Sequence, residues 1–361
     1  MIKVAILGVS GYGGSEVLRI LNTHNDVTIN HFGANTQAGI PISQSLGQFY
    51  GIFNNIMQQS DLVEIARESD CIITATPHKF LAEILTKEIV KQSVIIDLSA
   101  DFRLKNPKKY EEYYHFTHPN PELLQDSVYG LCEINKSAIT HANLIANPGC
   151  YPTCSTLCIL PLLQRGIIED SSIIIDAKSG VSGAGRSAKL ENLFCEVHDN
   201  IKAYGLIKHR HVAEIEQNLG LFSQLQPHHS SSNKDYKDIH ITFTPHLIPM
   251  NRGILVTAYA NLSASYINIT QADIDSVYEE FCENKIFVRH LKGGIAPQTR
   301  WVKGSNFVDI SACLDSRNKR VIMMGAIDNL IKGAAGAAIQ NLNLRFGFKE
   351  SQALEDIALF P

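Results

Sequence analysis

The residues with the clearest chemical potential lie in the segment NPGCYPT, residues 147–153, which places Cys150 directly after a Pro-Gly turn. The stretch that follows, residues 155–163, has the apolar density of a buried helix. A thiol at a helix N-terminus is driven toward thiolate, because unpaired N–H groups and the helix dipole favour negative charge there. Thiolate is the nucleophilic form, so we predict that Cys150 attacks a carbonyl carbon. The alternative is an inert buried cysteine beside a turn.

Cys154 and Cys158 follow Cys150 at helical spacing. Three thiols on one helix face suggest a metal site, but structural zinc normally needs four closely placed ligands and the sequence offers no fourth nearby. We therefore predict no metal and expect Cys154 and Cys158 to be small core residues. The eight cysteines include no Cys-x-x-Cys pair, and the chain opens on a strand-like run without room for a signal peptide, so a cytoplasmic location is expected.

A glycine-rich turn, Gly8-x-x-Gly11-x-x-Gly14, follows the strand-like run at residues 4–7 and precedes a helix expected to begin near Ser15. Glycines let the backbone turn tightly and approach a pyrophosphate, and the helix N-terminus supplies the positive end of a dipole. In this strand–turn–helix context the motif predicts a dinucleotide site rather than a simple turn.

The second strand-like run, residues 27–32, is followed by Asn35 and Thr36, which can hydrogen-bond a 2′-phosphate. No Asp or Glu stands there to take both ribose hydroxyls, as sites for NAD usually provide. The sequence therefore favours NADP over NAD, although no arginine follows the strand.

Two further motifs carry polar groups. Residues 179–186 (SGVSGAGR) either let a nicotinamide or substrate lie against backbone or form a flexible loop. Residues 209–211 (HRH) either supply an acid/base group for a hemithioacetal oxygen or cap a surface helix. Because two histidines two residues apart cannot both point at one spot on a regular helix, one is expected to be catalytic and the other a structural or substrate contact.

Residues 97–103 (DLSADFR) come at the end of the apolar run at residues 94–98, where open parallel sheets bind ligands. The guanidinium of Arg103 has the fork geometry that suits a carboxylate or an acyl phosphate. The alternative is a surface ion pair between Arg103 and Asp101.

Two kinds of structure must position these motifs. Before residue 150, strand-like and helical runs alternate, which predicts an α/β, Rossmann-type parallel sheet; after it, longer strand-like runs predict an α+β catalytic domain with a large mixed sheet. The expected strands are 4–7, 27–32, 71–74, 94–98, 172–177, 240–245, 254–260, 307–314 and 320–324, and the expected helices include 16–21, 80–90, 271–282 and 326–344. We expect a dinucleotide-binding domain of residues 1–149, completed by a C-terminal helical region at 326–361, and a catalytic and oligomerisation domain of residues 150–325.

Composition excludes several classes of partner. The 361 residues are 45% hydrophobic and 19% charged with a net charge of -4, which gives no general attraction to nucleic acid or to an anionic membrane. No apolar run reaches membrane-spanning length. The polar tract at residues 227–236 contains His228 and His229, which we interpret as part of a solvated loop rather than a metal site.

Together the motifs resemble the N-acetyl-gamma-glutamyl-phosphate reductase family, NADPH-dependent enzymes of arginine biosynthesis, and more distantly the aspartate-semialdehyde dehydrogenases. The resemblance runs almost end to end and also rests on YGLCE at 129–133, PMNRGI at 249–254 and AIDNLIKG at 326–333. Members of the family often carry an arginine soon after the second strand, where this chain has Gln37.

The resemblance implies that Cys150 is the nucleophile and His209 the acid/base group. It implies substrate contacts from Arg103, Arg186, Tyr204 and His211. The residues that it places near NADP(H) are Gly8, Ser10, Gly11, Tyr12, Gly13, Gly14, Thr36, Ser182, Gly183, Asn329 and Lys332.

The implied reaction reduces N-acetyl-glutamyl 5-phosphate to N-acetyl-glutamate 5-semialdehyde and phosphate through a thioester on Cys150, in a homodimer or homotetramer. Backbone N–H groups after Cys150 are expected to stabilise the oxyanion. Two alternatives stay open. One is a related reductase, such as aspartate-semialdehyde dehydrogenase or a carrier-protein-linked reductase of lysine biosynthesis. The other is a non-catalytic regulator that binds a dinucleotide.

Overall fold

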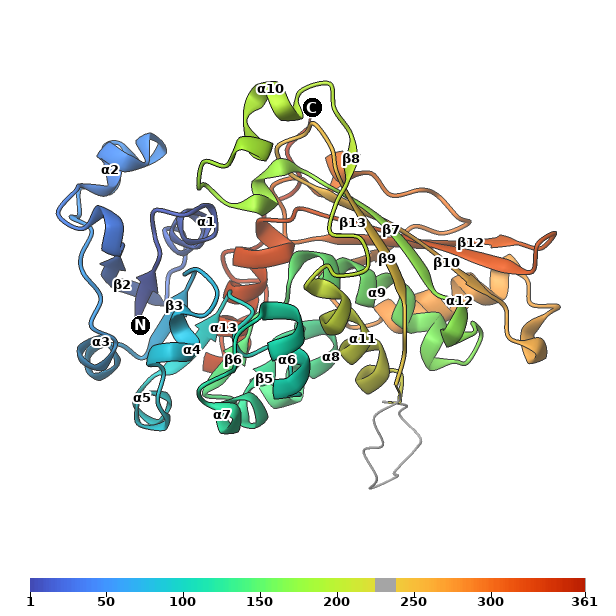
Figure 1. The fold of residues 1–361 in the computed structure, drawn as a ribbon, viewed down its shortest axis with the longest axis horizontal. Helices are drawn as coiled ribbons and strands as arrows, with labels where there is room; N and C mark the ends of the chain where they lie inside the picture. Colours follow the sequence, from blue (N-terminus) through green and yellow to red (C-terminus); the bar gives the residue numbers. More distant parts are fainter. Residues whose placement is uncertain (225–237, 361) are drawn as a thin grey trace. The chain divides into compact units, whose positions relative to one another are not determined.

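The computed structural model describes residues 1–224 and 238–360, so the tract at 227–236 lies outside the described residues. The chain divides into two compact units (Figure 1). The first comprises Met1–Pro148 and Ala334–Asp356, and the second comprises Gly149–Gly333 and the residues from Ile357 onward.

The first unit is built on a parallel sheet of six strands in the order β2-β1-β3-β4-β6-β5. The chain adds β2 on one side of β1 and then crosses to add β3 on the other, so the strand order reverses between β1 and β3, which is where ligands bind in such sheets. The strands are β1 (Ile2–Leu7), β2 (Val27–Gly33), β3 (Cys71–Thr74), β4 (Val94–Asp97), β5 (Val128–Tyr129) and β6 (Leu144–Ala146).

Helices cover the sheet of the first unit. Alternate residues of its strands, such as Leu7, Ile72 and Ile95, pack with apolar residues of α3, α4, α5 and α7 in one buried cluster, while α13 packs against β4, α1 and α8. The helices are α1 (Tyr12–Leu21), α2 (Ile42–Ser45), α3 (Leu62–Glu68), α4 (Phe80–Ile84), α5 (Lys87–Gln92), α6 (Pro107–Tyr114), α7 (Pro121–Asp126), α8 (Cys132–Ile139) and α13 (Gly336–Phe346).

The second unit is built on a mixed sheet of seven strands in the order β11-β12-β13-β10-β7-β9-β8. Helices α9 and α12 pack on its strands. The elements are α9 (Cys150–Gln164), β7 (Ile174–Ser179), α10 (Phe194–Val197), β8 (Lys202–Ala203), α11 (His211–Phe222), β9 (Thr242–Leu247), β10 (Ile254–Asn261), α12 (Gln271–Cys282), β11 (Val288–His290), β12 (Val308–Asp315) and β13 (Arg320–Ile327). Among the described residues, no helix is both long and apolar enough to cross a membrane.

The close approach of α9 to the sheet explains its small residues. A Cβ on Gly325 of β13 would lie 2.9 Å from the Sγ of Cys154 and 3.3 Å from the Cβ of Cys158. Both cysteines are fully buried, as predicted for core residues, and burial raises the pKa of each thiol. A larger side chain at any of these three positions would push the helix off the strand.

Three predicted helix boundaries are wrong. The helix expected near Ser15 begins at Tyr12, because the glycines already adopt its first turn. The helix expected at 80–90 is broken after α4, and Thr86 caps the start of α5 by accepting from the N–H of Ile89. The helix expected from residue 326 starts later, because Ile327 pairs with both Ile254 and Val308 in the sheet. A π-helical turn (Ile331–Ala335) then precedes α13.

Steric limits, as well as flexibility, require the glycines of the turn between β1 and α1. Gly8 has φ of +84°, and a Cβ there would lie 2.4 Å from the carbonyl oxygen of Ala75, which follows β3. A Cβ on Gly14 would lie 2.2 Å from the carbonyl oxygen of Gly8. Gly11 is the N-cap of α1 and provides no side-chain cap. The turn is therefore packed against the next strand end with its helix N-terminus uncapped.

Gly14→Ala should lower the free energy of unfolding by about 1–3 kcal/mol, because the new methyl group overlaps main-chain atoms that are held by the sheet. Gly13→Ala is the matched control: its Cβ would meet only Leu98 Cδ2 at 3.6 Å and Ala75 Cβ at 3.7 Å, ordinary contact distances. Urea unfolding of both variants measures the difference. Equal stability of the two would contradict this account of the turn.

Candidate active site

Cys150 is the first residue of α9, and the helix N-cap is Gly149, which has extended backbone angles and no side-chain cap. The third residue of the helix, Pro152, has no N–H to contribute. The Cys150 side chain is partly exposed, whereas Cys154 and Cys158 are buried. The positive end of the α9 dipole therefore lies at the one thiol of the three that solvent reaches, as predicted.

The backbone packs tightly around Cys150. A Cβ on Gly333, in the π-helical turn, would lie 2.6 Å from the Cβ of Cys150. The N–H of Gly149 donates to Oε1 of Glu214 at 2.8 Å. These two contacts fix the main chain at Cys150 from two sides.

Five aromatic rings gather beside the start of α9. The ring centroid of His209 lies 5.6 Å from Tyr151, 5.5 Å from Tyr204, 5.0 Å from His211 and 5.3 Å from Phe243. The hydroxyl groups of Tyr151 and Tyr204 are 3.0 Å apart, and burial raises the pKa of Tyr204 to about 12. The structure thus brings together Tyr204, His209 and His211, which the sequence had assigned to one site.

The rings of the two histidines lie 5.0 Å apart, although two residues at this spacing on a regular helix could not point at one spot. The reason is local: α11 begins at His211, and His209 precedes the helix and is not bound by its geometry. The N–H of His211 donates to Nδ1 of His209 at 3.1 Å. Nδ1 is therefore an acceptor, which places the proton of the neutral His209 ring on Nε2.

His209 is held in its neutral form. Burial lowers its pKa to about 4, and the positive charge of Arg210 adds to this effect. Gly205 has φ of +57°, and a Cβ there would lie 3.0 Å from Cδ2 and 3.4 Å from Cβ of His209, so the backbone packs closely against this side of the histidine. At neutral pH the ring presents a neutral hydrogen-bond donor.

The second glycine-rich segment is anchored to the sheet end and to Asn329. Ser182 and Gly183 lie in a short 3₁₀ turn (Val181–Ala184), and the Nδ2 of Asn329 donates to the Ser182 Oγ at 3.0 Å. Oδ1 of Asn329 accepts from the N–H of Gly253 at 2.8 Å. The segment is therefore held at its start, whereas Arg186 beyond it is exposed.

Lys332 and Arg103 are both buried, in different units. Lys332 is 1% exposed, and its ammonium lies 5.5 Å from the ring centroid of Phe287. Arg103 is 5% exposed and donates from Nε to the carbonyl oxygen of Asn147 at 2.8 Å and from Nη2 to that of Leu98 at 2.7 Å. Burial excludes the surface ion pair considered for Arg103, which here joins the ends of β4 and β6.

Family models match both halves of the chain: "Semialdehyde dehydrogenase, NAD binding domain" over residues 3–142 and "Semialdehyde dehydrogenase, dimerisation domain" over residues 150–329. Two similar curated proteins are named N-acetyl-gamma-glutamyl-phosphate reductase. One, from Lachnoclostridium phytofermentans, is 48% identical over 100% of both chains; the other, from Campylobacter jejuni subsp. doylei, is 52% identical over 99% of both.

The chain belongs to the N-acetyl-gamma-glutamyl-phosphate reductase family. The predicted family and fold class are confirmed. The crystal structure of aspartate semialdehyde dehydrogenase II from Vibrio cholerae has a TM-score of 0.69 with 16% identity, and the match covers 96% of this chain and 98% of that one, so it shows a shared fold.

Three residues of this site were not predicted from the sequence: Tyr151, Glu214 and Phe243. Tyr151 is adjacent to Cys150, and its ring also contacts Phe243 at 5.3 Å. Glu214 stands among the apolar residues that open α11, and a charged residue on a buried helix face is the signal that was available. Phe243 belongs to a strand whose contact with His209 no local pattern indicates.

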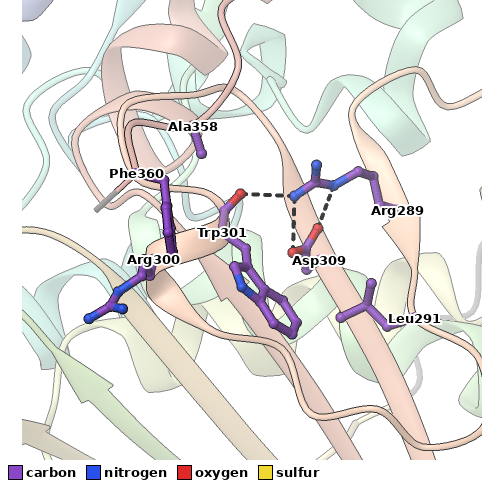
Figure 2. Close-up of a pocket in the computed structure, with 7 residues that line it drawn as sticks. All are labelled: Arg289, Leu291, Arg300, Trp301, Asp309, Ala358 and Phe360. Atoms are coloured by element: carbon purple, nitrogen blue, oxygen red, sulfur yellow. Dashed lines mark hydrogen bonds and ion pairs between the residues drawn. The ribbon is translucent and has the colours of Figure 1, made fainter.

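A cavity of about 500 Å³ lies on the second unit (Figure 2). Arg289 donates hydrogen bonds to both carboxylate oxygens of Asp309, at 2.6 and 3.0 Å, and to the carbonyl oxygen of Trp301. Figure 2 marks these three contacts. The guanidinium of Arg300 lies 5.4 Å from the ring centroid of Phe360. None of the predicted site residues lines this cavity, and we assign it no part in the site.

The neutral state of His209 predicts a specific acid sensitivity. The unfolded chain takes up a proton near the ordinary pKa of about 6.5, whereas the folded chain takes it up near pH 4. Between these values the unfolded state binds more protons, so stability falls as the pH falls. His209→Asn should reduce the loss of unfolding free energy between pH 7 and pH 4 by roughly 2–3 kcal/mol. Denaturant unfolding across this range tests it, and an unchanged pH dependence would contradict the buried neutral ring.

Proposed function

We propose that this protein reduces N-acetyl-glutamyl 5-phosphate to N-acetyl-glutamate 5-semialdehyde and phosphate with NADPH, in the cytoplasm. The observation that carries the proposal is the partly exposed Cys150 at the start of α9, in the unit that also holds the neutral His209. A thiolate nucleophile and a neutral donor are the two groups that reduction of an acyl phosphate through a thioester requires.

The residues of the first unit fit a dinucleotide. A side chain at Gly8 or Gly14, in the turn between β1 and α1, would overlap main-chain atoms, so the turn needs glycine at both positions. Helix α1 begins without a side-chain cap, so its first turn suits a pyrophosphate. We assign the cofactor to the turn from Gly8 to Gly14, with Ser10 and Tyr12, and to Thr36, Ser182, Gly183, Asn329 and Lys332. NADPH, when bound, supplies the hydride.

Cys150 starts the reaction. Its Sγ forms a bond to the acyl carbon, and phosphate leaves with the electron pair of the broken C–O bond. After reduction of the thioester, the C–S bond of the hemithioacetal breaks and its electron pair returns to sulfur. Throughout, Nε2–H of His209 donates a hydrogen bond to the substrate oxygen, and main-chain N–H groups at the start of α9 donate to it as well.

The proposed substrate contacts are Arg103, Arg186, Tyr204 and His211. Of these, Tyr204 and His211 lie in the cluster around His209.

The reverse reaction tests the substrate. With phosphate and NADP⁺, N-acetyl-glutamate 5-semialdehyde should be oxidised with a kcat/KM at least about 10²-fold above that of aspartate semialdehyde or glyceraldehyde 3-phosphate, because the site must pair the polar groups of the longer substrate. The measurement is NADPH formation at 340 nm. Equal or higher kcat/KM for aspartate semialdehyde would assign the chain to that reaction instead.

Cys150→Ser is the control for the mechanism. It should nearly abolish turnover while the Kd for NADP⁺ stays within about twofold, because a hydroxyl is a far poorer nucleophile and leaving group than a thiolate. Substantial activity in this variant would remove Cys150 from the nucleophile role. Binding of NADP⁺ without turnover in the wild type would favour a regulator.

The match to a dimerisation domain supports a homo-oligomer, and we propose that its basic assembly is a homodimer formed by the face of the seven-stranded sheet that points away from α9. Gly325 faces α9, so the alternating residues Ile322 and Met324 of β13 point to the opposite face, with Leu255 and Tyr259 of β10 beside them. These four side chains are only partly buried.

Tyr259→Glu and Met324→Glu should shift the protein toward monomer, because each places an unpaired charge in the proposed apolar interface. Ile286→Glu is the control, since Ile286 is 49% exposed and lies outside β10 and β13. Light scattering after size exclusion measures the mass of each variant and distinguishes dimer from tetramer. Wild-type mass in both sheet variants would place the interface elsewhere.

A further inference from the structure

Glu214 is a buried carboxylate that the reaction above does not use. Its residue is 1% exposed and lies in the first turn of α11. A carboxylate there stabilises its own helix through the dipole. This one also reaches another helix, since its Oε1 accepts the N–H of Gly149 at 2.8 Å. The acceptor is therefore placed at the N-cap of α9, one residue before Cys150.

The orientation of the Gly149 peptide decides where Cys150 lies. Gly149 has φ of -69° and ψ of 152°, an extended conformation from which the chain turns into the helix. Its carbonyl accepts the N–H of Thr153 at 2.9 Å, which closes the first helical turn around Cys150. Glycine has the least intrinsic preference for any one conformation, so hydrogen bonds on both sides help to hold this residue. Thr153 holds its carbonyl from within the helix, and the carboxylate of Glu214 holds its N–H.

The same side chain connects the two catalytic segments. His211 is the first residue of α11 and its N–H fixes the ring of His209, while Glu214 follows one turn later on the same helix. A hydrogen bond from this turn to Gly149 fixes the position of Cys150 relative to the two histidines. Misplacement by about 1 Å is enough to cost on the order of 10² in rate when reacting groups must meet.

We propose that Glu214 is a positioning residue: its hydrogen bond with the Gly149 N–H fixes the main chain of Cys150 against the segment that carries His209. The inference rests on the proposed role of Cys150 in thioester formation. The chemical requirement is an acceptor oxygen at this place, which glutamine also provides.

Glu216 offers a matched control on the same helix. It is 7% exposed, and its Oε1 accepts a main-chain N–H, that of Ile241, at 3.2 Å. It therefore shares burial, charge and type of contact with Glu214, but its partner lies just before β9 and not at the start of α9. Loss of stability alone should affect both positions, whereas loss of catalytic placement should affect only Glu214.

The test compares Glu214→Ala, Glu214→Gln and Glu216→Ala. Glu214→Ala should lower kcat about 10–100-fold with the Kd for NADP⁺ unchanged, and Glu214→Gln should restore kcat to within about threefold of wild type. Glu216→Ala should keep kcat within about twofold even where its melting temperature falls. Hydrogen exchange of the peptide spanning residues 147–153 should be at least about tenfold faster in Glu214→Ala only.

Wild-type kcat in folded Glu214→Ala, or unchanged hydrogen exchange in that peptide, would overturn the proposal. A loss in Glu214→Gln as large as in Glu214→Ala would overturn it too, because charge rather than the hydrogen bond would then matter. Hydrogen exchange needs no substrate. If the wild type oxidises none of the aldehydes, the proposed function fails while the exchange result still decides whether Glu214 holds Gly149.

Discussion

The position of Cys150 depends on how closely α9 packs against the main chain of neighbouring elements. The helix meets β13 at Gly325 and the π-helical turn at Gly333, where added Cβ atoms would come within 2.9 Å of Cys154 Sγ and 2.6 Å of Cys150 Cβ. Contacts this short admit only glycine on one side and a small side chain on the other. The position of Cys150 is therefore set by packing along the helix, and the aromatic rings and histidines lie beside a helix start that cannot shift.

Within this packed frame, the surroundings of His209 set its protonation state. Burial and the charge of Arg210 keep His209 neutral, and the N–H of His211 selects the ring nitrogen that carries its proton. The thiol of Cys150 remains partly exposed at a helix N-terminus, where negative charge is favoured. An environment that lowers the pKa of a histidine in this way lets the ring remain a neutral hydrogen-bond donor at neutral pH.

The sequence predicted the helices and strands whose signals lie within a few neighbouring residues. Strands β1 to β4 of the parallel sheet and the start of α9 were predicted because apolar runs and a Pro-Gly turn are visible within a few residues, whereas the short strands β5 and β6 were not predicted. The continuation of β13 through Ile327 was missed, since pairing with β10 and β12 overrode the small, helix-compatible residues that follow.

The misses within the site have a different origin, because they depend on distant or boundary geometry. The convergence of His209 and His211 depends on where α11 begins, and a shift of two residues would undo it. The contact of Glu214 with Gly149 joins residues 65 apart in the chain, for which a single sequence carries no pattern.

The burial of Cys154 and Cys158 in the core has a chemical consequence for the partly exposed thiol of Cys150. Oxidation of Cys150 to a sulfenic acid is reversible when a second thiolate can form a disulfide with it. The two cysteines one and two turns along α9 are fully buried with raised pKa values, so neither is placed to act as that resolving thiol. Protection of this nucleophile from peroxide must therefore come from reductants outside these two positions.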